Sequence, residues 1–309
     1  MPQCPSSEAA VKTLRLAVPL LLAAFTLTCQ SDQTPVSPDT LSPVFASCGD
    51  PPCGRGPGGG GGSSSFALSF DGNDGTETPD ANDLDLTNTF TVEGWIKPDQ
   101  PAGLGFQDII VKWGGSVSAS YSIAFENDGR FDLVTHDPSA NPDNTKIFST
   151  AGAFVGGEWQ HFAIVFDGGQ AWLYVDGVLN SSCGGALGNC WHGNTGTQTV
   201  ASMNTPQVTT TPVSIGRQNS PEGFIGDHYR GVMDEIRVWN VARTAKQVRQ
   251  NMNKSLNLKK ANGLVAYWRM NEGSGQVAAD ASGNGHNLQL GNTGGGDAAD
   301  PAWVSPGKP

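Results

Sequence analysis

An aspartate in an otherwise apolar strand pattern is the first residue in this sequence that could do chemistry. Asp234 alternates with Val232 and Ile236, so a strand would point its carboxylate to the same side as apolar side chains. A charge on such a face cannot remain unpaired. A second candidate is the turn at 70–75, Phe-Asp-Gly-Asn-Asp-Gly, whose oxygen-bearing side chains and carbonyls suit a hard cation. Asp234 is therefore expected to have a specific partner.

A tryptophan and a histidine are the next candidates for ligand contact or catalysis. Trp191 follows Cys190 at the end of a polar, glycine-rich loop, and an aromatic fixed there could contact a ligand; packing within the loop is the alternative. His161 starts an apolar run and has no serine or cysteine motif beside it, so we expect a packed, hydrogen-bonded histidine and not a catalytic base. Most other tryptophans lie in strand patterns, where core packing is their ordinary role.

Four cysteines stand in two close pairs. In an oxidising compartment such pairs form disulfides that clamp a short loop. A zinc site is the alternative, but the short cysteine spacing and nearby histidines that structural zinc needs are missing. The sequence therefore predicts the disulfides Cys48–Cys53 and Cys183–Cys190.

The N-terminal segment has the layout of an export signal. Basic residues precede an apolar run at 16–25 that is too short to span a bilayer. Residues 26–29, Thr-Leu-Thr-Cys, resemble the lipobox of bacterial lipoproteins. We therefore expect residues 1–28 to be a signal peptide and Cys29 to carry the lipid, which would be the only membrane contact. This predicts an outer-membrane or cell-surface lipoprotein, with free secretion as the alternative.

The composition favours an acidic all-β protein with a flexible tether. The 309 residues include 41 Gly and 20 Pro, and only 15% are charged, which favours short strands joined by tight turns. A net charge of -11 without a Lys/Arg cluster argues against a nucleic-acid partner. Residues 29–65 lack periodic apolar positions and end in a Gly/Ser run, as a tether does. The folded domain is predicted to be 66–309.

Strands that could position these residues begin at Phe66, where apolar and polar residues start to alternate. The segment 162–166 is apolar on both faces, so we expect a central strand that is covered on each side. Turn residues at 127–129, 167–169 and 176–177 predict antiparallel hairpins.

One helix is predicted. It would begin at Thr244, whose hydroxyl can cap the first turn while Gln247 reaches back in a capping box. Val248, Met252 and Leu256 follow in four-residue steps and form one apolar stripe. We expect this helix to pack across one end of the sandwich.

Several separated segments together form a recognisable pattern. They are Ala-Leu-Ser-Phe-Asp-Gly at 67–72, Phe-Thr-Val-Glu-Gly-Trp-Ile-Lys-Pro at 90–98, Trp-Gln-His at 159–161, Leu-Tyr-Val-Asp-Gly at 173–177, Ser-Ile-Gly-Arg at 214–217, Gly-Val-Met-Asp-Glu-Ile-Arg-Val-Trp-Asn at 231–240 and Leu-Val-Ala-Tyr-Trp at 264–268. In this order they resemble the LamG-like jelly-roll domains of the concanavalin A-like superfamily. The resemblance covers nearly all of 66–303 and implies a two-sheet antiparallel jelly-roll sandwich of the kind that binds glycans or proteins.

The resemblance also implies a structural calcium. An aspartate in a motif like Met-Asp-Glu-Ile-Arg-Val at 233–238 resembles a calcium ligand of this superfamily, together with oxygens from the turn after the first strand. We therefore expect Asp71 and Asp234 to share a calcium ion, with Asn73 or Asp74 as a further ligand. A hydrogen-bonded, metal-free pair of aspartates is the alternative.

The predicted function is a non-catalytic cell-surface module that binds a glycan or an extracellular protein. A carbohydrate-active enzyme is an alternative, because sandwich relatives cleave polysaccharides with paired carboxylates on one strand. Glu126 and Asp128 straddle a turn and do not fit that arrangement. Asp234 and Glu235 are adjacent, so they face opposite sides and do not fit either. The third hypothesis is a purely structural adhesion protein.

Overall fold

The structure is a computed structural model that describes most of the predicted domain, namely residues 66–114, 119–140, 143–183, 190–192, 198–199, 201–219 and 225–308. The chain divides into two compact units, 1–57 and 58–309, and all described residues belong to the second. The predicted signal peptide, Cys29 and the Cys48–Cys53 pair lie outside the described residues. Across the described ranges, no helix has both the length and the apolar character needed to cross a membrane.

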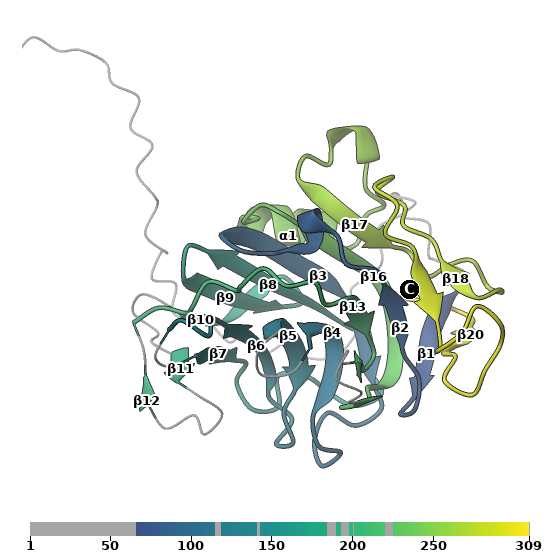
Figure 1. The fold of residues 1–309 in the computed structure, drawn as a ribbon, viewed down its shortest axis with the longest axis horizontal. Coiled ribbons are helices and arrows are strands. Elements are labelled where there is room, and N and C mark those ends of the chain that lie inside the picture. Colours follow the sequence, from purple (N-terminus) through teal and green to yellow (C-terminus); the bar gives the residue numbers. More distant parts are fainter. Residues whose placement is uncertain are drawn as a thin grey trace, which may run out of the picture. The chain divides into compact units, whose positions relative to one another are not determined.

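The first sheet is antiparallel and contains the two longest strands of the domain (Figure 1). Its order is β10–β9–β8–β3–β16–β1–β20, and β17 also pairs with β16. The strands are β10 (Val178–Cys183), β9 (Gln170–Val175), β8 (Gln160–Asp167), β3 (Thr89–Pro98), β16 (Arg230–Trp239), β1 (Ala67–Asp71), β20 (Ala302–Val304) and β17 (Leu264–Trp268). Neighbours in the sheet are often far apart in sequence, since β3 pairs with both β8 and β16.

The second sheet is also antiparallel and follows the order β12–β11–β7–β6–β5–β4–β13–β2–β19–β18. Its strands are β12 (Gln198–Thr199), β11 (Cys190–His192), β7 (Asn144–Phe148), β6 (Phe131–His136), β5 (Ala119–Phe125), β4 (Gln107–Trp113), β13 (Val213–Ile215), β2 (Thr76–Thr78), β19 (Leu288–Leu290) and β18 (Val277–Ala278). A separate short ribbon pairs β14 (Gln218–Asn219) with β15 (Ile225–Gly226). Two 3-10 turns, η1 (Asn82–Leu84) and η2 (Leu258–Lys260), complete the described elements together with helix α1 (Ala245–Asn251).

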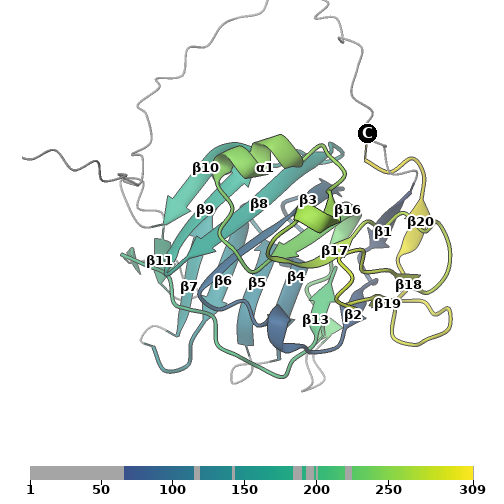
Figure 2. The same cartoon turned by 90° about the horizontal axis from the view of Figure 1, so that it is seen from above.

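The core lies between the two sheets, which form stacked layers in Figure 2. Along β5, Tyr121, Ile123 and Phe125 belong to the buried cluster. Ser122 and Ala124 alternate with them and so point to the opposite face of the second sheet. The fold is therefore the expected all-β jelly-roll sandwich, and alternation along its strands separates a core face from an outer face.

Strand β8 is covered on both faces, which confirms the prediction for 162–166. Phe162 and Ile164 belong to the core between the sheets. Ala163 and Val165 belong to a second buried cluster with Val248 of α1. The helix therefore covers the face of the first sheet that points away from the second sheet, and the prediction that it crosses one end of the sandwich is wrong (Figure 2).

Helix α1 begins as predicted but is shorter than the apolar stripe suggested. Thr244 accepts from the backbone N–H of Gln247, whose side chain accepts from the backbone N–H of Thr244, so the capping box is present. The helix ends at Asn251, and the prediction that Leu256 continues it is wrong. Arg237 of the sheet donates to the carbonyls of Asn251 (3.1 Å) and Lys254 (3.0 Å), and this tertiary contact satisfies the end of the helix.

The predicted turns connect antiparallel neighbours. Residues 127–129 join β5 to β6, and 168–169 join β8 to β9. Between β9 and β10, Asp176 and Gly177 have φ values of 50° and 73°. Two successive positive φ values are what a tight hairpin turn requires, which explains the Asp-Gly sequence there.

Candidate ligand-binding site

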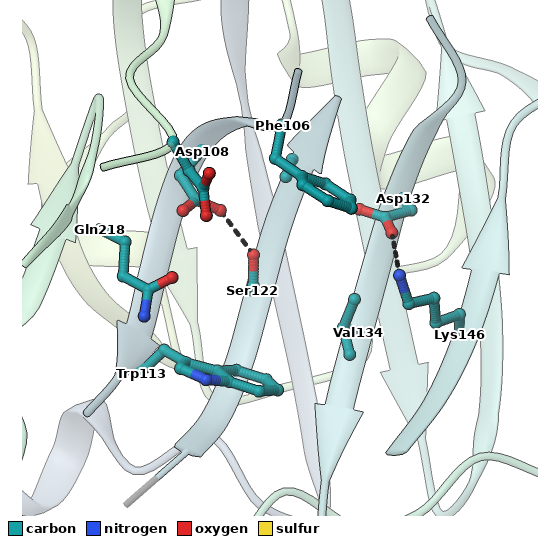
Figure 3. A pocket seen from close by; sticks show the side chains of 10 residues that line it. Phe106, Asp108, Trp113, Ser122, Asp132, Val134, Lys146 and Gln218 are labelled. Atoms are coloured by element: carbon teal, nitrogen blue, oxygen red, sulfur yellow. Dashed lines mark hydrogen bonds and ion pairs between the residues drawn. The ribbon is translucent and has the colours of Figure 1, made fainter. Parts of the chain in front are cut away.

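A hollow opens on the face of the second sheet that points away from the core (Figure 3). Strands β4 to β7 form its floor, and the segment before β4 and the β14–β15 ribbon contribute its sides. We call it the first hollow; its volume is about 280 Å³, and it is lined by Phe106, Asp108, Trp113, Ser122, Ala124, Asp132, Val134, Lys146, Gln218 and Asp227.

Cross-strand pairing brings the floor residues together. Ala124 on β5 lies opposite Asp108 on β4 and opposite Asp132 on β6. Residues directly opposite each other point to the same face of a sheet. The register therefore places two aspartates in one row, on the two sides of a small residue that leaves space between them.

Asp108 is a buried carboxyl with one side-chain hydrogen bond in Figure 3. Its Oδ1 accepts from the Oγ of Ser122 at 2.7 Å, and only 4% of the residue is exposed. Burial raises the pKa of Asp108 to about 8, the bond from Ser122 opposes this shift, and the charge of Asp227 adds to it. At neutral pH the group is therefore mostly protonated and can both donate and accept.

Asp132 is buried beside a lysine that it shares with another acid. The Nζ of Lys146 lies 3.7 Å from Asp132 Oδ2 and 2.6 Å from Glu126 Oε1. Burial raises the pKa of Asp132 well above its usual value, although Lys146 opposes the shift. Asp132 is 1% exposed, and its Oδ1 has no hydrogen-bond partner among the described residues. Leaving a buried oxygen without a partner costs about 1–3 kcal/mol.

Two aromatic side chains border this polar floor. Phe106 is 47% exposed, and its ring lies 5.6 Å from the Nζ of Lys146. Trp113 is half-buried at the end of β4, with its ring 5.5 Å from that of His136. In Figure 3, Phe106 lies between Asp108 and Asp132 at one end of the hollow, and Trp113 lies at the other end. The arrangement can hold a ligand that has both an apolar face and several hydrogen-bonding groups.

Burial raises the pKa of three carboxyls that line the first hollow, namely those of Asp108, Asp132 and Asp227. It therefore favours the protonated form of each of them.

The structure places Trp191 in strand β11, and the prediction that it belongs to a loop is wrong. Trp191 lies opposite Lys146 on β7, so it shares the outer face of the sheet with the first hollow. Its ring is half-buried, 6.3 Å from that of Phe148, and it is one strand away from the hollow's lining. The predicted disulfide Cys183–Cys190 is present, with 4.9 Å between the Cα atoms.

The expected calcium ligands Asp71 and Asp234 do not come together. On the paired strands, Asp71 lies opposite Arg230 and Leu68 lies opposite Met233. Asp234 is four positions along β16 from Arg230, which corresponds to about 13 Å. One ion cannot contact both carboxylates, so the prediction of a shared calcium site is wrong. The sequence positions of the two aspartates did not show how their strands are aligned.

Each of these aspartates binds protein groups instead. Asp234 is fully buried and accepts from the backbone N–H of Lys308 at 2.9 Å. In the turn, Asp71 Oδ1 accepts from the backbone N–H of Asn73 (2.9 Å), while Asp74 Oδ2 accepts from that of Asp71 (2.6 Å). Burial raises the pKa of Asp74 to about 6. Within the described ranges, no group of three or more His, Cys, Asp or Glu side chains could hold a metal ion, and a calcium elsewhere stays a prediction of the family resemblance.

His161 is packed, as expected. It is 1% exposed, and its ring lies 5.4 Å from that of Trp95 in an edge-to-face arrangement. Burial holds the pKa of His161 well below its usual value, so the ring is neutral. The expected hydrogen bond is missing at Nδ1, which has no partner in the described part of the chain.

The acids considered for catalysis bind other protein groups. Glu126 binds the lysine of the first hollow, whereas Asp128 binds Arg130 at 2.7 Å. Glu235 has a φ of 55° within a bulge of β16 and binds Arg237 at 2.6 Å, while Asp234 accepts from a backbone N–H. These carboxylates do not form a paired site.

Sequence reasoning missed the residues that form the first hollow, including Phe106, Asp108, Asp132 and Lys146. A usable signal was present for one of them. The predicted hairpin at 127–129 already pairs β5 with β6, and alternation then puts Asp132 on the face opposite to Phe131. The pairing of β4 with β5 has a register shift, so the place of Asp108 could not be inferred in the same way.

The sandwich and its hollow define a jelly-roll protein with a ligand-sized depression on one sheet. The chain belongs to the concanavalin A-like lectin/glucanases superfamily, because the Laminin_G_3 family model matches residues 70–249. No curated protein matches the chain closely enough to count as a relative.

Solved structures share the fold at low sequence identity. A proposed carbohydrate-binding protein from Bacteroides ovatus is 18% identical with a TM-score of 0.55, over 79% of this chain and 60% of that one. The chain thus spans well under two thirds of that protein's length. A SAP-like pentraxin from Limulus polyphemus is 16% identical (TM-score 0.45, 74% and 95% covered), and the CBM40 of a Ruminococcus gnavus sialidase bound to sialyllactose is 12% identical (0.44, 62% and 99%). At these identities the similarity shows the fold alone.

Proposed function

We propose that this protein is a non-catalytic carbohydrate-binding module that holds a glycan in the first hollow. The observation that carries the proposal is the pairing of aromatic rings with buried hydrogen-bonding groups on one open sheet face. A sugar ring has an apolar face of C–H groups and a rim of hydroxyls, so it matches this combination. The fold shared with the proposed carbohydrate-binding protein from Bacteroides ovatus supports the same class of ligand.

Particular groups would contact particular parts of the sugar. Phe106 and Trp113 present ring surface for stacking. Asp132 and Lys146 also line the hollow and carry groups that can hydrogen-bond to a hydroxyl. Asp108 can donate as well as accept, since burial keeps it mostly protonated at neutral pH. The amide of Gln218 lies at the side of the hollow and adds a further donor and acceptor.

We also propose that the module is displayed at the cell surface. The export signal and the cysteine at position 29 support this placement, and the tether over 29–65 would separate the domain from its anchor. A glycan on the surface of another cell, or a free polysaccharide, would then be the partner.

A glycan array probed with the full chain tests the binding function. We expect a defined set of oligosaccharides to bind, and Phe106→Ala and Trp113→Ala to weaken binding at least about tenfold, or about 1.4 kcal/mol. Leu258→Ala is the matched control, because Leu258 is 43% exposed and lies in η2 outside the hollow. Binding to no glycan, or equal binding by all three variants and the unmodified protein, would contradict the proposal.

A further inference from the structure

We propose that the binding site extends past the first hollow and takes a chain of sugar units, with consecutive units in two adjoining hollows and a neutral unit in the first. This inference rests on the proposed carbohydrate-binding function. It goes further by stating the minimum length of the ligand and its charge.

A second hollow lies directly beside the first. It has a volume of about 290 Å³ and is lined by Gly72, Leu104, Gly105, Phe106, Asp227, His228 and Arg230. Phe106 and Asp227 line both hollows. The two depressions are therefore neighbours that meet at one aromatic side chain.

Phe106 is placed to contact two consecutive sugar units. It is 47% exposed, although it lines both hollows, so its ring surface is available to a ligand. Leu104 is also exposed, at 43%. Gly105 between them has a φ of 85°, and a Cβ there would meet no atom within 4 Å. The segment thus presents an apolar edge with open space beside it, along which a sugar chain can pass.

The second hollow offers its own hydrogen-bonding groups. The guanidinium of Arg230 lies against Gly72, where a Cβ would come within 2.8 Å of Arg230 Nη2. Arg230 is exposed and forms no ion pair in the part of the chain that the structure describes. The Nδ1 of His228 lies 3.3 Å from the carbonyl oxygen of Asp74; with the proton on Nδ1, the other ring nitrogen is an acceptor. A donor and an acceptor together suit the hydroxyls of a second sugar unit.

The charges of the first hollow favour a neutral unit. Three of its lining residues are aspartates, and its one cation, Lys146, already lies 2.6 Å from Glu126. A carboxylate or sulfate on the unit in the first hollow would therefore lie among carboxyl groups without a free positive partner in that hollow. Burying such an unpaired negative charge is unfavourable, whereas hydroxyls can bond to carboxyls in either protonation state.

Calorimetric titration of the full chain against sugars of defined length tests both parts of the proposal. The probes are neutral gluco-, manno- and arabino-oligosaccharides of one to six units, together with galacturonic acid oligomers of the same lengths. In the neutral series that binds best, affinity should rise at least about tenfold between one unit and three. The galacturonic acid oligomers should bind at least about tenfold more weakly than that series.

A matched pair of arginine variants locates the second unit. Arg230→Gln should weaken binding of the trisaccharide and leave binding of the single unit unchanged. Arg249→Gln is the control, because Arg249 is exposed on α1, which covers the first sheet and not the second.

The outcomes separate this inference from the proposed function. Equal affinity for one unit and for three, or an equal effect of Arg230→Gln on both, would overturn the two-hollow site while binding itself stands. Galacturonic acid oligomers that bind as tightly as the neutral sugars would overturn the selection for neutral units. If no sugar of any length binds, the proposed function fails, and this inference fails with it.

Discussion

At the scale of single residues, several carboxyl groups of this protein are buried, and each has a different hydrogen-bonding or ionic partner. Asp234 accepts from a backbone N–H near the C-terminus, and Glu93 binds Arg243 beneath helix α1. Asp108 has a serine hydroxyl as its side-chain partner and no cation in direct contact. An acid buried without a close cation favours its protonated form, which is why the pKa of Asp108 is raised to about 8.

Replacing Asp108 should reveal the cost of that burial. Burial raises the pKa of Asp108 from 3.8 to about 8, so between these values the folded state binds more protons than the unfolded state. The contribution of Asp108 to the free energy of unfolding therefore falls as pH rises from about 4 to about 8. Asp108→Asn keeps an acceptor for Ser122 and cannot ionise, so its stability should decline less over this range. Thermal unfolding at pH 5 and pH 8 measures the difference, and parallel declines in both proteins would contradict the assignment.

At the scale of elements, the two sheets are joined at one edge by a covalent bond. The Cys183–Cys190 disulfide connects the end of β10 in the first sheet to the start of β11 in the second. Strand β11 in turn pairs with β7, whose Lys146 lies in the first hollow. The disulfide thus holds the short strand β11 next to the strands that form the floor of the first hollow.

Removing this bond should destabilise the sandwich modestly. Closing a loop of this length restricts the unfolded chain by about 2–3 kcal/mol. The double variant Cys183→Ser/Cys190→Ser should lower the free energy of unfolding by that amount, measured by urea denaturation of the oxidised proteins. A reducing agent should shift the midpoint of the unmodified protein and not that of the variant. Identical midpoints for the two oxidised proteins would show that the bond does not contribute.

At the scale of the whole molecule, a jelly-roll domain is combined with an N-terminal segment of very different composition. Residues 29–65 are rich in Pro, Gly and Ser, whereas the alternating strand pattern begins at Phe66. The tether predicted for these residues would hold the domain on the order of 30–35 Å from an anchor. Such reach would suit the surface-displayed module proposed above.

The anchor can be tested by changing Cys29. A lipidated N-terminal cysteine should place the unmodified protein in the membrane fraction, because two or more acyl chains hold a protein firmly on a bilayer. Cys29→Ser should move it to the soluble fraction, as judged by fractionation and by mass spectrometry of the N-terminus. If the unmodified protein is already found entirely in the medium, the lipoprotein interpretation is wrong and ordinary secretion replaces it.

Local sequence patterns were sufficient for much of the fold. Alternation along strands, the Asp-Gly turn at 176–177 and the capping box at Thr244 depend on neighbouring residues, so they could be predicted and are confirmed. The close pair Cys183 and Cys190 belongs to the same group. The length of α1 did not follow from its own residues, because Arg237 from a distant strand donates to the carbonyl of Asn251, the last residue of the helix, and to that of Lys254 beyond it.

The ligand site and the relation of Asp71 to Asp234 were decided only by the tertiary structure. Strand register is a non-local property: Asp71 and Asp234 lie on adjacent strands, and only their pairing shows that they are too far apart to share an ion. The same applies to the first hollow, where Asp108 and Asp132 face each other across β5 because three strands pair in one particular alignment. The sequence by itself identified the types of side chain that could bind a ligand. The hydrogen bonding between strands determined which of these side chains lie close together.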